Sequence, residues 1–468
     1  MRSTIALSGI AVGGIAVLLG QMNATAVPGN RGNRNTGFIG QDVVVGSIPS
    51  VARWSSSGGL TSYSMATTSC NIGDEVLTWQ ANNNNHPVIP QSLWRLHDCR
   101  VEEIGKSWSK HGFCALQQNL CGSCSPAGGG CPAALGVGCS DPYSASLNGD
   151  QGGLGPRWET NAWTGFFEYP FDNPSYSGGL ARRLVVDNDD LASSSYPGAV
   201  YYAAACYVHP EDAEDNNHWN NHSIRKVDVG NFSSGGYNIS LTGSTRIGQT
   251  PPEILIYEDV DSALVRDVDI PDEGRFTVGM TCCDNGDGTW TYNYMIFNVN
   301  SHLSCSGLEI PLGSGVTATD MNFSDADYHS GEPYDNEDWD MNVLSNSVFW
   351  SSPKESENPN ANAIRWHSMH TFWFTADSPP ATGDVILDLH RDHPDGIDAI
   401  TFKGYIPSDL SEPCIGDING DQIVDGTDLG FLLGAWGVTP PPWGDFDGNN
   451  IVDGVDLGVL LGNWGFCR

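Results

Sequence analysis

The C-terminal part of this chain contains one 22-residue segment twice, at 416–437 and 444–465. The two copies share 15 of 22 positions. Each copy begins with a dense run of Asp, Asn and Gly and ends in a short apolar stretch. Because a repeat predicts the same structural unit in each copy, the sequence predicts two oxygen-rich loops that each lead into a short helix.

Carboxylate and amide side chains recur within each loop at positions 1, 3, 5, 9 and 12. Alternate residues that turn toward a hard cation surround it with oxygen ligands, and a backbone carbonyl at position 7 completes the set. The predicted calcium ligands are Asp417, Asn419, Asp421, Ile423, Asp425 and Asp428 in the first loop and Asp445, Asp447, Asn449, Ile451, Asp453 and Asp456 in the second. We therefore expect two Ca²⁺ ions; the alternative is a pair of acidic loops that face solvent.

These loops differ from the general calcium-loop motif, which has Gly at position 6 and Glu at position 12. Position 6 is Gln422 or Asn450 here, and position 12 is Asp in both copies. A paired loop–helix unit of this kind resembles a dockerin over residues 414–467. The resemblance implies calcium-dependent folding and docking onto a cohesin-like receptor. Gln accepts a tight turn less well than Gly, so we expect weaker calcium binding in the first loop. Cys414 and Cys467 flank the repeats, and we expect them to clasp the ends of the module.

The N-terminus predicts export. A basic residue at position 2, an apolar run at 5–19 and Ala24-Thr25-Ala26 form the pattern of a signal peptide (1–26) cleaved after Ala26. The run is too short for a membrane-spanning helix, and no later segment is long and apolar enough, so we expect a secreted protein without a membrane span. Export permits disulfides. The 13 cysteines are then mostly bridged, and the odd count predicts one free or intermolecular thiol.

The net charge and the distribution of turn residues predict the partners and the fold class of the remaining chain. A net charge of −35 with 21 basic residues argues against nucleic acid or an anionic membrane as partner. Short Val, Ile, Tyr, Phe and Trp runs between turn residues predict strands such as 200–202 and 253–257 and a hairpin at 276–298. We expect a mainly β protein. Its parts are a flexible N-terminus at 27–42, two β-sandwich-like domains at 43–229 and 230–407, and a small α-helical dockerin at 414–467.

The histidines and cysteines of the first domain allow two kinds of chemistry. The histidines either supply imidazoles to copper or zinc or are structural, and they are His86, His97, His111, His209, His218 and His222. Cys121 and Cys124 have the spacing of a zinc-ligand pair, and Cys131 and Cys139 follow them. Disulfides are the favoured interpretation in an exported, cysteine-dense domain.

Several segments in a fixed order resemble the catalytic domain of the lysyl oxidase family, over about 71–229. Lys110 stands three residues before Phe113-Cys114, the segment Gly138-Cys-Ser-Asp-Pro-Tyr143 follows, and Asn220-Asn221 precedes Arg225. The resemblance implies a lysine tyrosylquinone built from Lys110 and Tyr143 with copper and O₂. Such a quinone would oxidise primary amines through a Schiff base. Asp141 is close enough in sequence to be considered as a base.

The copper ligands are where the sequence departs from that family. The family has His-x-His-x-His before the lysine, and the matching residues here are Asn82, Asn84 and His86. Amides are poor copper ligands, so His86 is the candidate and other histidines would have to complete the site. The alternative is a fold retained without its chemistry, with Lys110 as a surface cation and Tyr143 as a half-buried aromatic.

The second predicted domain has no recognisable family motif. The alternation at 290–297 predicts a half-buried strand, and 363–366 and 371–374 predict core strands. The acidic run at 335–340 is either a solvated loop or a site where Trp339 stacks on a sugar ring. Cys282, Cys283 and Cys305 allow one bridge and leave one thiol over.

Three function classes follow from the sequence. The first is a secreted amine oxidase of lysyl oxidase type, and the second is a non-catalytic glycan-binding or adhesive subunit. The third is a glycoside hydrolase, which needs two carboxylates about 5 Å or about 6.5–9.5 Å apart across a cleft.

Overall fold

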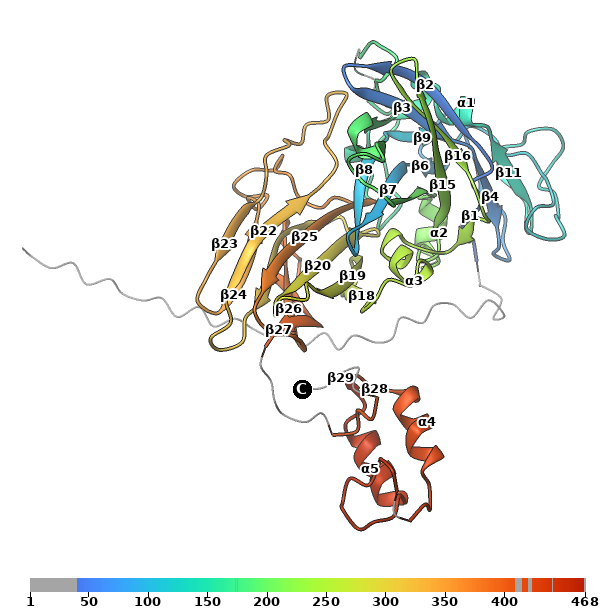
Figure 1. The fold of residues 1–468 in the computed structure, drawn as a ribbon. Helices are drawn as coiled ribbons and strands as arrows, with labels where there is room; N and C mark the ends of the chain where they lie inside the picture. Colours follow the sequence, from blue (N-terminus) through green and yellow to red (C-terminus); the bar gives the residue numbers. More distant parts are fainter. Residues whose placement is uncertain are drawn as a thin grey trace, which may run out of the picture.

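The computed structural model describes residues 40–172, 174, 176–408, 415–419, 423–439 and 441–466. Antiparallel strands make up most of these residues and the helices are short (Figure 1), so the prediction of a mainly β protein is confirmed. The predicted signal peptide at 1–26, the pair Cys414 and Cys467, and Asp421 of the first loop lie outside the described residues. Among the described residues, every helix is too short or too polar to cross a bilayer.

A nine-stranded antiparallel sheet organises the first half of the described chain. In spatial order its strands are β16 (Gly236–Leu241), β15 (His222–Ser233), β14 (Val200–Cys206), β7 (Gln91–His97), β8 (Arg100–Lys106), β13 (Leu184–Asp187), β3 (Leu60–Met65) and β2 (Val51–Ser57), with β17 (Arg246–Ile247) beside β15. The sheet curls toward a barrel, because Arg53 on β2 donates to the carbonyl of Ser233 (2.6 Å) and to Asn238 Oδ1 (3.1 Å) on the far edge. The predicted boundary after residue 229 falls inside β15, and the sheet continues to Ile247.

Smaller elements accompany this sheet. The strands are β1 (Val43–Ser47), β4 (Thr67–Asn71) and β11 (Ser140–Tyr143) in one sheet, β5 (Leu77–Thr78) and β10 (Ala134–Leu135) in a second, and β6 (Val88–Ile89), β9 (Ser109–His111) and β12 (Leu154–Gly155) in a third. The helices are α1 (Ala145–Asn148) and α2 (Pro210–Glu214), with 3₁₀ turns at Gln151–Gly153, Arg157–Glu159 and Asn188–Leu191. Disulfides Cys70–Cys121, Cys114–Cys131 and Cys124–Cys139 brace this region, as the sequence predicts for these cysteines.

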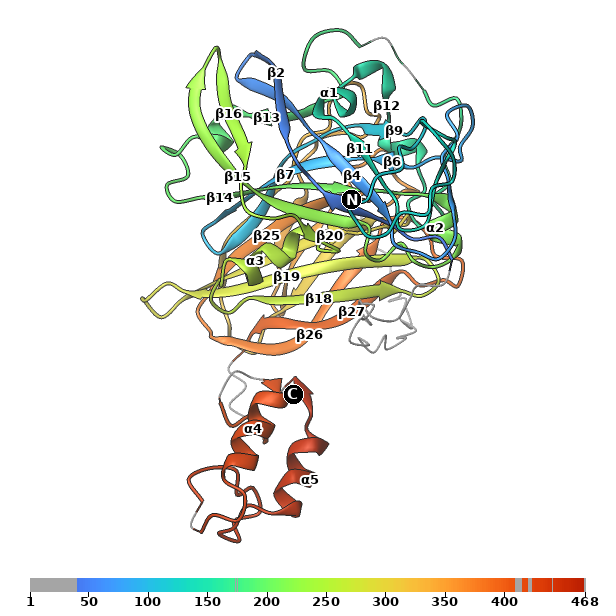
Figure 2. The same cartoon turned by 90° about the vertical axis from the view of Figure 1, so that its right-hand side faces the viewer.

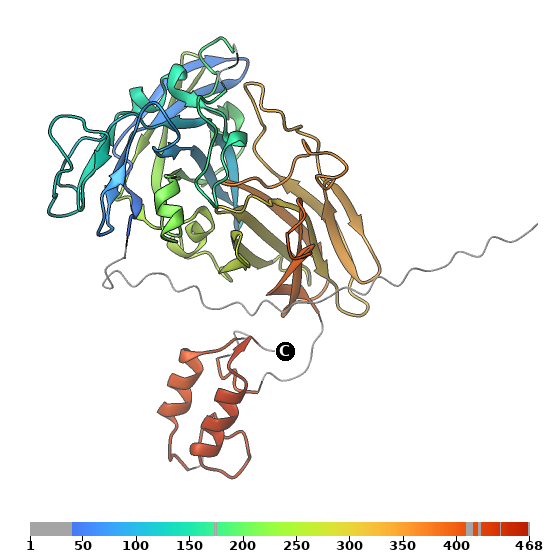
Figure 3. The same ribbon diagram turned by 180° about the vertical axis from the view of Figure 1, so that it is seen from behind.

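Two five-stranded sheets form the second half (Figures 2 and 3). One contains β18 (Leu264–Ile270), β19 (Gly274–Asp284), β20 (Trp290–Asn298), β25 (Ser368–Ala376) and β22 (Ala318–Ser324), and the other contains β23 (Asp340–Val343), β24 (Ser347–Ser351), β21 (Cys305–Pro311), β26 (Pro380–Leu389) and β27 (Ala399–Pro407). The sheets share one core, in which Phe276 and Tyr294 of the first sheet join Trp350 and Val385 of the second. The predicted hairpin at 276–298 is confirmed as β19 and β20, and the predicted strand at 371–374 lies in β25.

The two halves also share a core. On β20, Tyr292 and Tyr294 face the partner sheet, whereas Met295 and Phe297 pack in a separate cluster with Trp94 of the large sheet. Since both faces of β20 are covered, the prediction of a half-buried strand at 290–297 is wrong for most of its length. The disulfide Cys99–Cys283 also joins the two halves.

Two predicted strands of the second half are not strands. The segment 253–257 forms helix α3 (Ile254–Tyr257) behind a 3₁₀ turn at Pro251–Glu253. Its two prolines lack the N–H groups that a sheet needs, and Glu253 closes a capping box with Thr250, so the chain starts a helix. The segment 363–366 is irregular apart from a bridge between Ile364 and Cys305.

The cysteine and Trp339 predictions for this half are also corrected. Neighbouring residues on a strand point to opposite faces, so Cys282 enters the core whereas Cys283 reaches Cys99. Three described cysteines (Cys206, Cys282 and Cys305) are buried free thiols, and the prediction of a single free thiol is wrong. Trp339 is 2% exposed and its Nε1 donates to the carbonyl of Asn362 (2.5 Å), so it is a core residue and not a sugar platform.

The C-terminal module is the helical part of the molecule. It contains β28 (Ile423–Val424), α4 (Gly426–Gly434), α5 (Gly454–Gly462) and β29 (Gly465–Phe466), with the two helices side by side (Figure 2). Its small core takes Val424 and Leu432 from the first repeat and Val452 and Leu460 from the second. Each repeat therefore covers the apolar face of the other.

Candidate functional site

The position-12 aspartates organise the two C-terminal loops. Asp456 is fully buried, and its carboxylate accepts hydrogen bonds from the backbone N–H groups of Phe446 (2.7 Å) and Asp453 (2.9 Å). Asp428 accepts the equivalent two bonds in the first repeat at the same distances. Burial by itself would raise the pKa of Asp456, but the backbone donors outweigh it and hold this pKa below its usual value. Both repeats thus bond the position-12 carboxylate to the backbone at the base of the loop.

The second loop turns its acidic side chains toward one point. Asp445, Asp447 and Asp456 each bring a carboxylate oxygen to within 4.8 Å of the others. Asn450 at position 6 has φ +69°, the left-handed conformation that the general motif assigns to Gly. Asp453, like Asp425 in the first loop, caps the following helix. The remaining predicted ligands in the described residues are Asp417, Asn419, Ile423, Asn449 and Ile451, and they lie in the same two loops.

Lys110 and Tyr143, the residues paired by the lysyl oxidase resemblance, are both buried. Lys110 lies on β9 at 5% exposure, so its interpretation as a surface cation is wrong. Burial lowers the pKa of the Lys110 amine, and Asp150 partly opposes the shift. A Cβ at Gly153 would collide with this amine, so Gly153 makes room for it. The centroid of the Phe113 ring lies 5.6 Å from Lys110 Nζ and 5.2 Å from the centroid of the Tyr143 ring.

The Tyr143 hydroxyl has a complete set of hydrogen bonds. It accepts from Trp79 Nε1 (3.0 Å) and from the backbone N–H of Phe113 (3.0 Å), and it donates to the carbonyl of Cys114 (3.1 Å). Burial raises the pKa of Tyr143 to about 12, with a contribution from Asp141, whose own pKa burial raises to about 7. Tyr143 is therefore a neutral phenol that joins β11 to the 113–114 backbone.

His86 is close to one other imidazole. Its Nδ1 pairs with the carbonyl of Gln80 (2.7 Å) and its Nε2 lies 3.0 Å from His111 Nδ1. The rings pack among Phe167, Tyr169 and Phe171. No third histidine, cysteine or carboxylate in the described part of the chain converges with this pair. Asn82 and Asn84 lie in the preceding turn.

Two of the other candidate histidines have separate environments. His209 caps α2 by accepting from the backbone N–H of Glu211 (3.1 Å), and its Nε2 pairs with the carbonyl of Thr78 (2.7 Å). His218 packs between the indoles of Trp163 and Trp219. The tertiary structure thus distributes the sequence-predicted imidazoles over several places instead of one.

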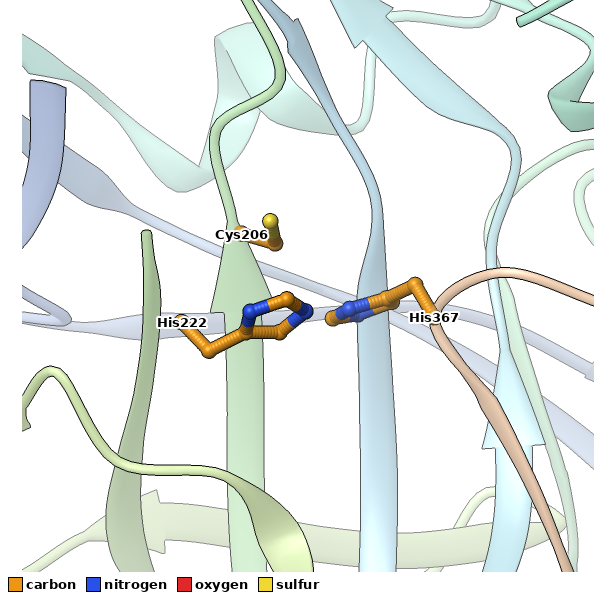
Figure 4. A group of neighbouring side chains, drawn as sticks. All are labelled: Cys206, His222 and His367. Atoms are coloured by element: carbon orange, nitrogen blue, oxygen red, sulfur yellow. The ribbon is translucent and has the colours of Figure 1, made fainter. Parts of the chain in front are cut away.

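A further group of ligand-type side chains joins the two halves. Cys206, His222 and His367 each place one ligand atom within 4.8 Å of the other two, and all three are buried (Figure 4). Of these three, only His222 is among the ligands predicted from the sequence. The strand register pairs Cys206 with His222, and nothing local in the sequence marks Cys206 or His367.

Comparisons with known proteins do not show a family for this chain. No protein-family model and no curated protein matches it. Solved structures give partial alignments to the serine-rich repeat adhesion glycoprotein Srr1 from Streptococcus agalactiae (7% identity, 73% of this chain and 88% of that chain, TM-score 0.17). A second alignment is to the N-terminal domain of the Streptococcus gordonii adhesin Sgo0707 (6% identity, 80% of this chain and 100% of that chain, TM-score 0.19). A third is to the B domain of a biofilm-associated protein (9% identity, 90% of this chain and 97% of that chain, TM-score 0.15). TM-scores at this level do not establish a shared fold.

Proposed function

We propose that this protein is an extracellular calcium-binding subunit, attached to a cohesin-like receptor through its dockerin-like C-terminal module. Its β-rich body serves as a non-catalytic glycan-binding or adhesive unit. The observation that carries the proposal is the matched pair Asp428 and Asp456, which are buried and bonded to the backbone in the same way in both repeats. A repeat that holds two carboxylates buried at the base of two loops suits two hard cations with oxygen ligands.

The surface of the module suits docking. Leu433 and Leu461 occupy the same repeat position and are 53% and 52% exposed, and Trp436 and Trp464, again equivalent, are 44% and 49% exposed. Exposed apolar residues on a small module are typical of a protein–protein interface. Because they recur in both repeats, the module offers a receptor two similar faces.

The compartment and the body support a binding role. Four disulfides among the described residues indicate an oxidising, extracellular environment. Tyr143 and His86 have structural hydrogen-bond partners at each polar atom. These partners favour a body that keeps its fold without quinone chemistry.

Calcium titration tests the proposal. The chelator-treated full-length protein is expected to bind two Ca²⁺ per chain and to bind cohesin modules from a panel only when calcium is present. Asp428→Ala and Asp456→Ala should each remove one site, whereas Asp384→Ala, an exposed residue on β26, should remove neither. Binding of fewer than two Ca²⁺, or receptor binding that persists in EDTA, contradicts the proposal.

An amine oxidase is a second candidate, and the position of the Phe113 ring near both Lys110 Nζ (5.6 Å) and the Tyr143 ring (5.2 Å between centroids) supports it. If protein exported with copper contains a covalent peptide joining Lys110 to Tyr143, peptide mass spectrometry will detect it. Unmodified Lys110 and Tyr143 peptides in copper-supplied protein would remove this candidate and leave the binding role.

A further inference from the structure

Cys206 and His222 are cross-strand neighbours in the large sheet. Cys206 is the last residue of β14 and His222 is the first of β15, and the register pairs them directly. Directly opposed side chains in an antiparallel pair lie on the same face of the sheet, close to each other. The segment that connects the two strands, which includes α2, is therefore flanked by a thiol and an imidazole that lie close together.

His367 comes from the second half of the molecule. It directly precedes β25 and has φ +54°, a conformation that few residues other than Gly adopt. Its backbone is fixed on both sides, because its N–H donates to the carbonyl of Asn298 (2.7 Å) and its carbonyl accepts from Arg157 Nη1 (3.0 Å). A strained backbone held by its neighbours aims this imidazole at the Cys206–His222 pair.

The two imidazoles lack partners. His222 is 2% exposed and His367 is fully buried, and none of their four ring nitrogens has a hydrogen-bond partner among the described residues. Buried polar atoms without partners are rare and costly. The rings lie nearly parallel with centroids 5.1 Å apart, and Phe297 packs edge-on against both. Figure 4 shows the two rings facing each other with Cys206 beside them.

The separation of the three ligand atoms is close to that found in a metal site. Metal bonds of about 2.0–2.3 Å place ligand atoms roughly 3.3–3.9 Å apart, and the three ligand atoms already lie within 4.8 Å of one another. A small approach of these side chains would bring all three ligand atoms into bonding distance of one ion.

We propose that Cys206, His222 and His367 bind one late first-row transition-metal ion, copper or zinc, through one thiolate and two imidazoles. Sulfur and imidazole ligands select these metals, whereas Ca²⁺ and Mg²⁺ require oxygen. On binding, the Cys206 thiol releases its proton to solvent and the sulfur forms the metal bond, while the imidazoles bind as neutral ligands. The ion ties β14 and β15 to the segment before β25, so it links the two halves. This site is independent of the calcium loops and of docking.

Metal analysis of the full-length exported protein tests the proposal. After supply of copper and zinc and removal of loosely bound metal, we expect one equivalent of either metal in the wild type and none at this site in Cys206→Ser. Cys282→Ser replaces another buried free thiol and should keep the full equivalent. Copper gives a paramagnetic signal when oxidised and zinc does not, so electron paramagnetic resonance separates the two metals.

Cobalt substitution gives a second readout, and its first part needs only the wild-type protein. Co²⁺ added to the metal-depleted wild type should produce a thiolate-to-cobalt charge-transfer absorption that Cys206→Ser abolishes and His367→Gln shifts. The proposal is overturned if the wild type binds no more metal than folded Cys206→Ser, or if the cobalt protein shows no thiolate band.

Discussion

Asp456→Ala in the loop of the second repeat separates the backbone contacts that the structure shows for this carboxylate from the calcium-ligand role that we propose for it. In the metal-free protein, Asp456 accepts hydrogen bonds from the backbone N–H groups of Phe446 in the loop and of Asp453, with which it closes a capping box. In the calcium-loaded protein, we propose, it also supplies the position-12 ligand. The substitution removes both contributions, and only the second depends on calcium.

The expected magnitudes differ between the two conditions. Loss of a helix cap costs about 1 kcal/mol, within a range of about 0.5–2 kcal/mol. A ligand at 100 times its Kd stabilises the folded state by about 2.7 kcal/mol. Asp456→Ala is therefore expected to destabilise the second repeat by about 1 kcal/mol in EDTA and by about 4 kcal/mol in saturating calcium.

Hydrogen-exchange mass spectrometry reads this difference in the full chain. Peptides that cover α5 should exchange about 100-fold more slowly in calcium than in EDTA in the wild type, because 2.7 kcal/mol corresponds to about that factor. Asp456→Ala should lose the calcium effect. Asp456→Asn retains one acceptor oxygen, so it should keep more of the protection seen in EDTA while still losing the calcium effect.

Full calcium-dependent protection of α5 in Asp456→Ala would refute the assignment of position 12 as a ligand. Asp384→Ala serves as the control, since Asp384 is exposed on β26 and its side chain is 57% accessible. A loss of protection of similar size in that variant would show that net charge, and not the loop, controls the exchange.

Three further predictions concern the β-rich body. Burial raises the pKa of Asp42 to about 7 against a smaller opposing effect of Asn220, so the folded state holds a proton more tightly than the unfolded state and stability falls as pH rises from 3.8 to about 7. Asp42→Asn should reduce the loss of stability between pH 5 and pH 8 by about 3 kcal/mol, measured by thermal melts at each pH, and an unchanged pH slope would contradict this. Loss of Cys99–Cys283, which spans 184 residues, should cost about 2–5 kcal/mol in denaturant titrations. The double variant Cys99→Ser/Cys283→Ser should lose no more stability than either single variant. Tyr143→Phe leaves two buried N–H donors unpaired and should cost about 2–4 kcal/mol, whereas a cost near zero would show that the hydroxyl has no structural role.

The large errors of prediction concern strands whose two faces lie against different parts of the molecule. Alternation at 290–297 correctly indicates a strand, but exposure depends on what covers the second face, and only the packing of Phe297 against the large sheet decides it. In the same way, Cys282 is a buried free thiol and Cys283 forms a disulfide, because adjacent residues of a strand point to opposite faces. Local pattern carries no information about which distant segment lies on either side.

The sequence by itself determined the features that are local. Turn and strand composition fixed the mainly β class, the β19–β20 hairpin and the disulfide character of Cys114 and Cys131, and the repeat predicted two loop–helix units before any contact was known. The tertiary structure alone decided the shared core of the two halves and the meeting of Cys206, His222 and His367. The physical reason is sequence separation. Residues 206 and 367 come together only because sheets built from different parts of the chain bury their apolar faces against each other, and that burial depends on the whole fold.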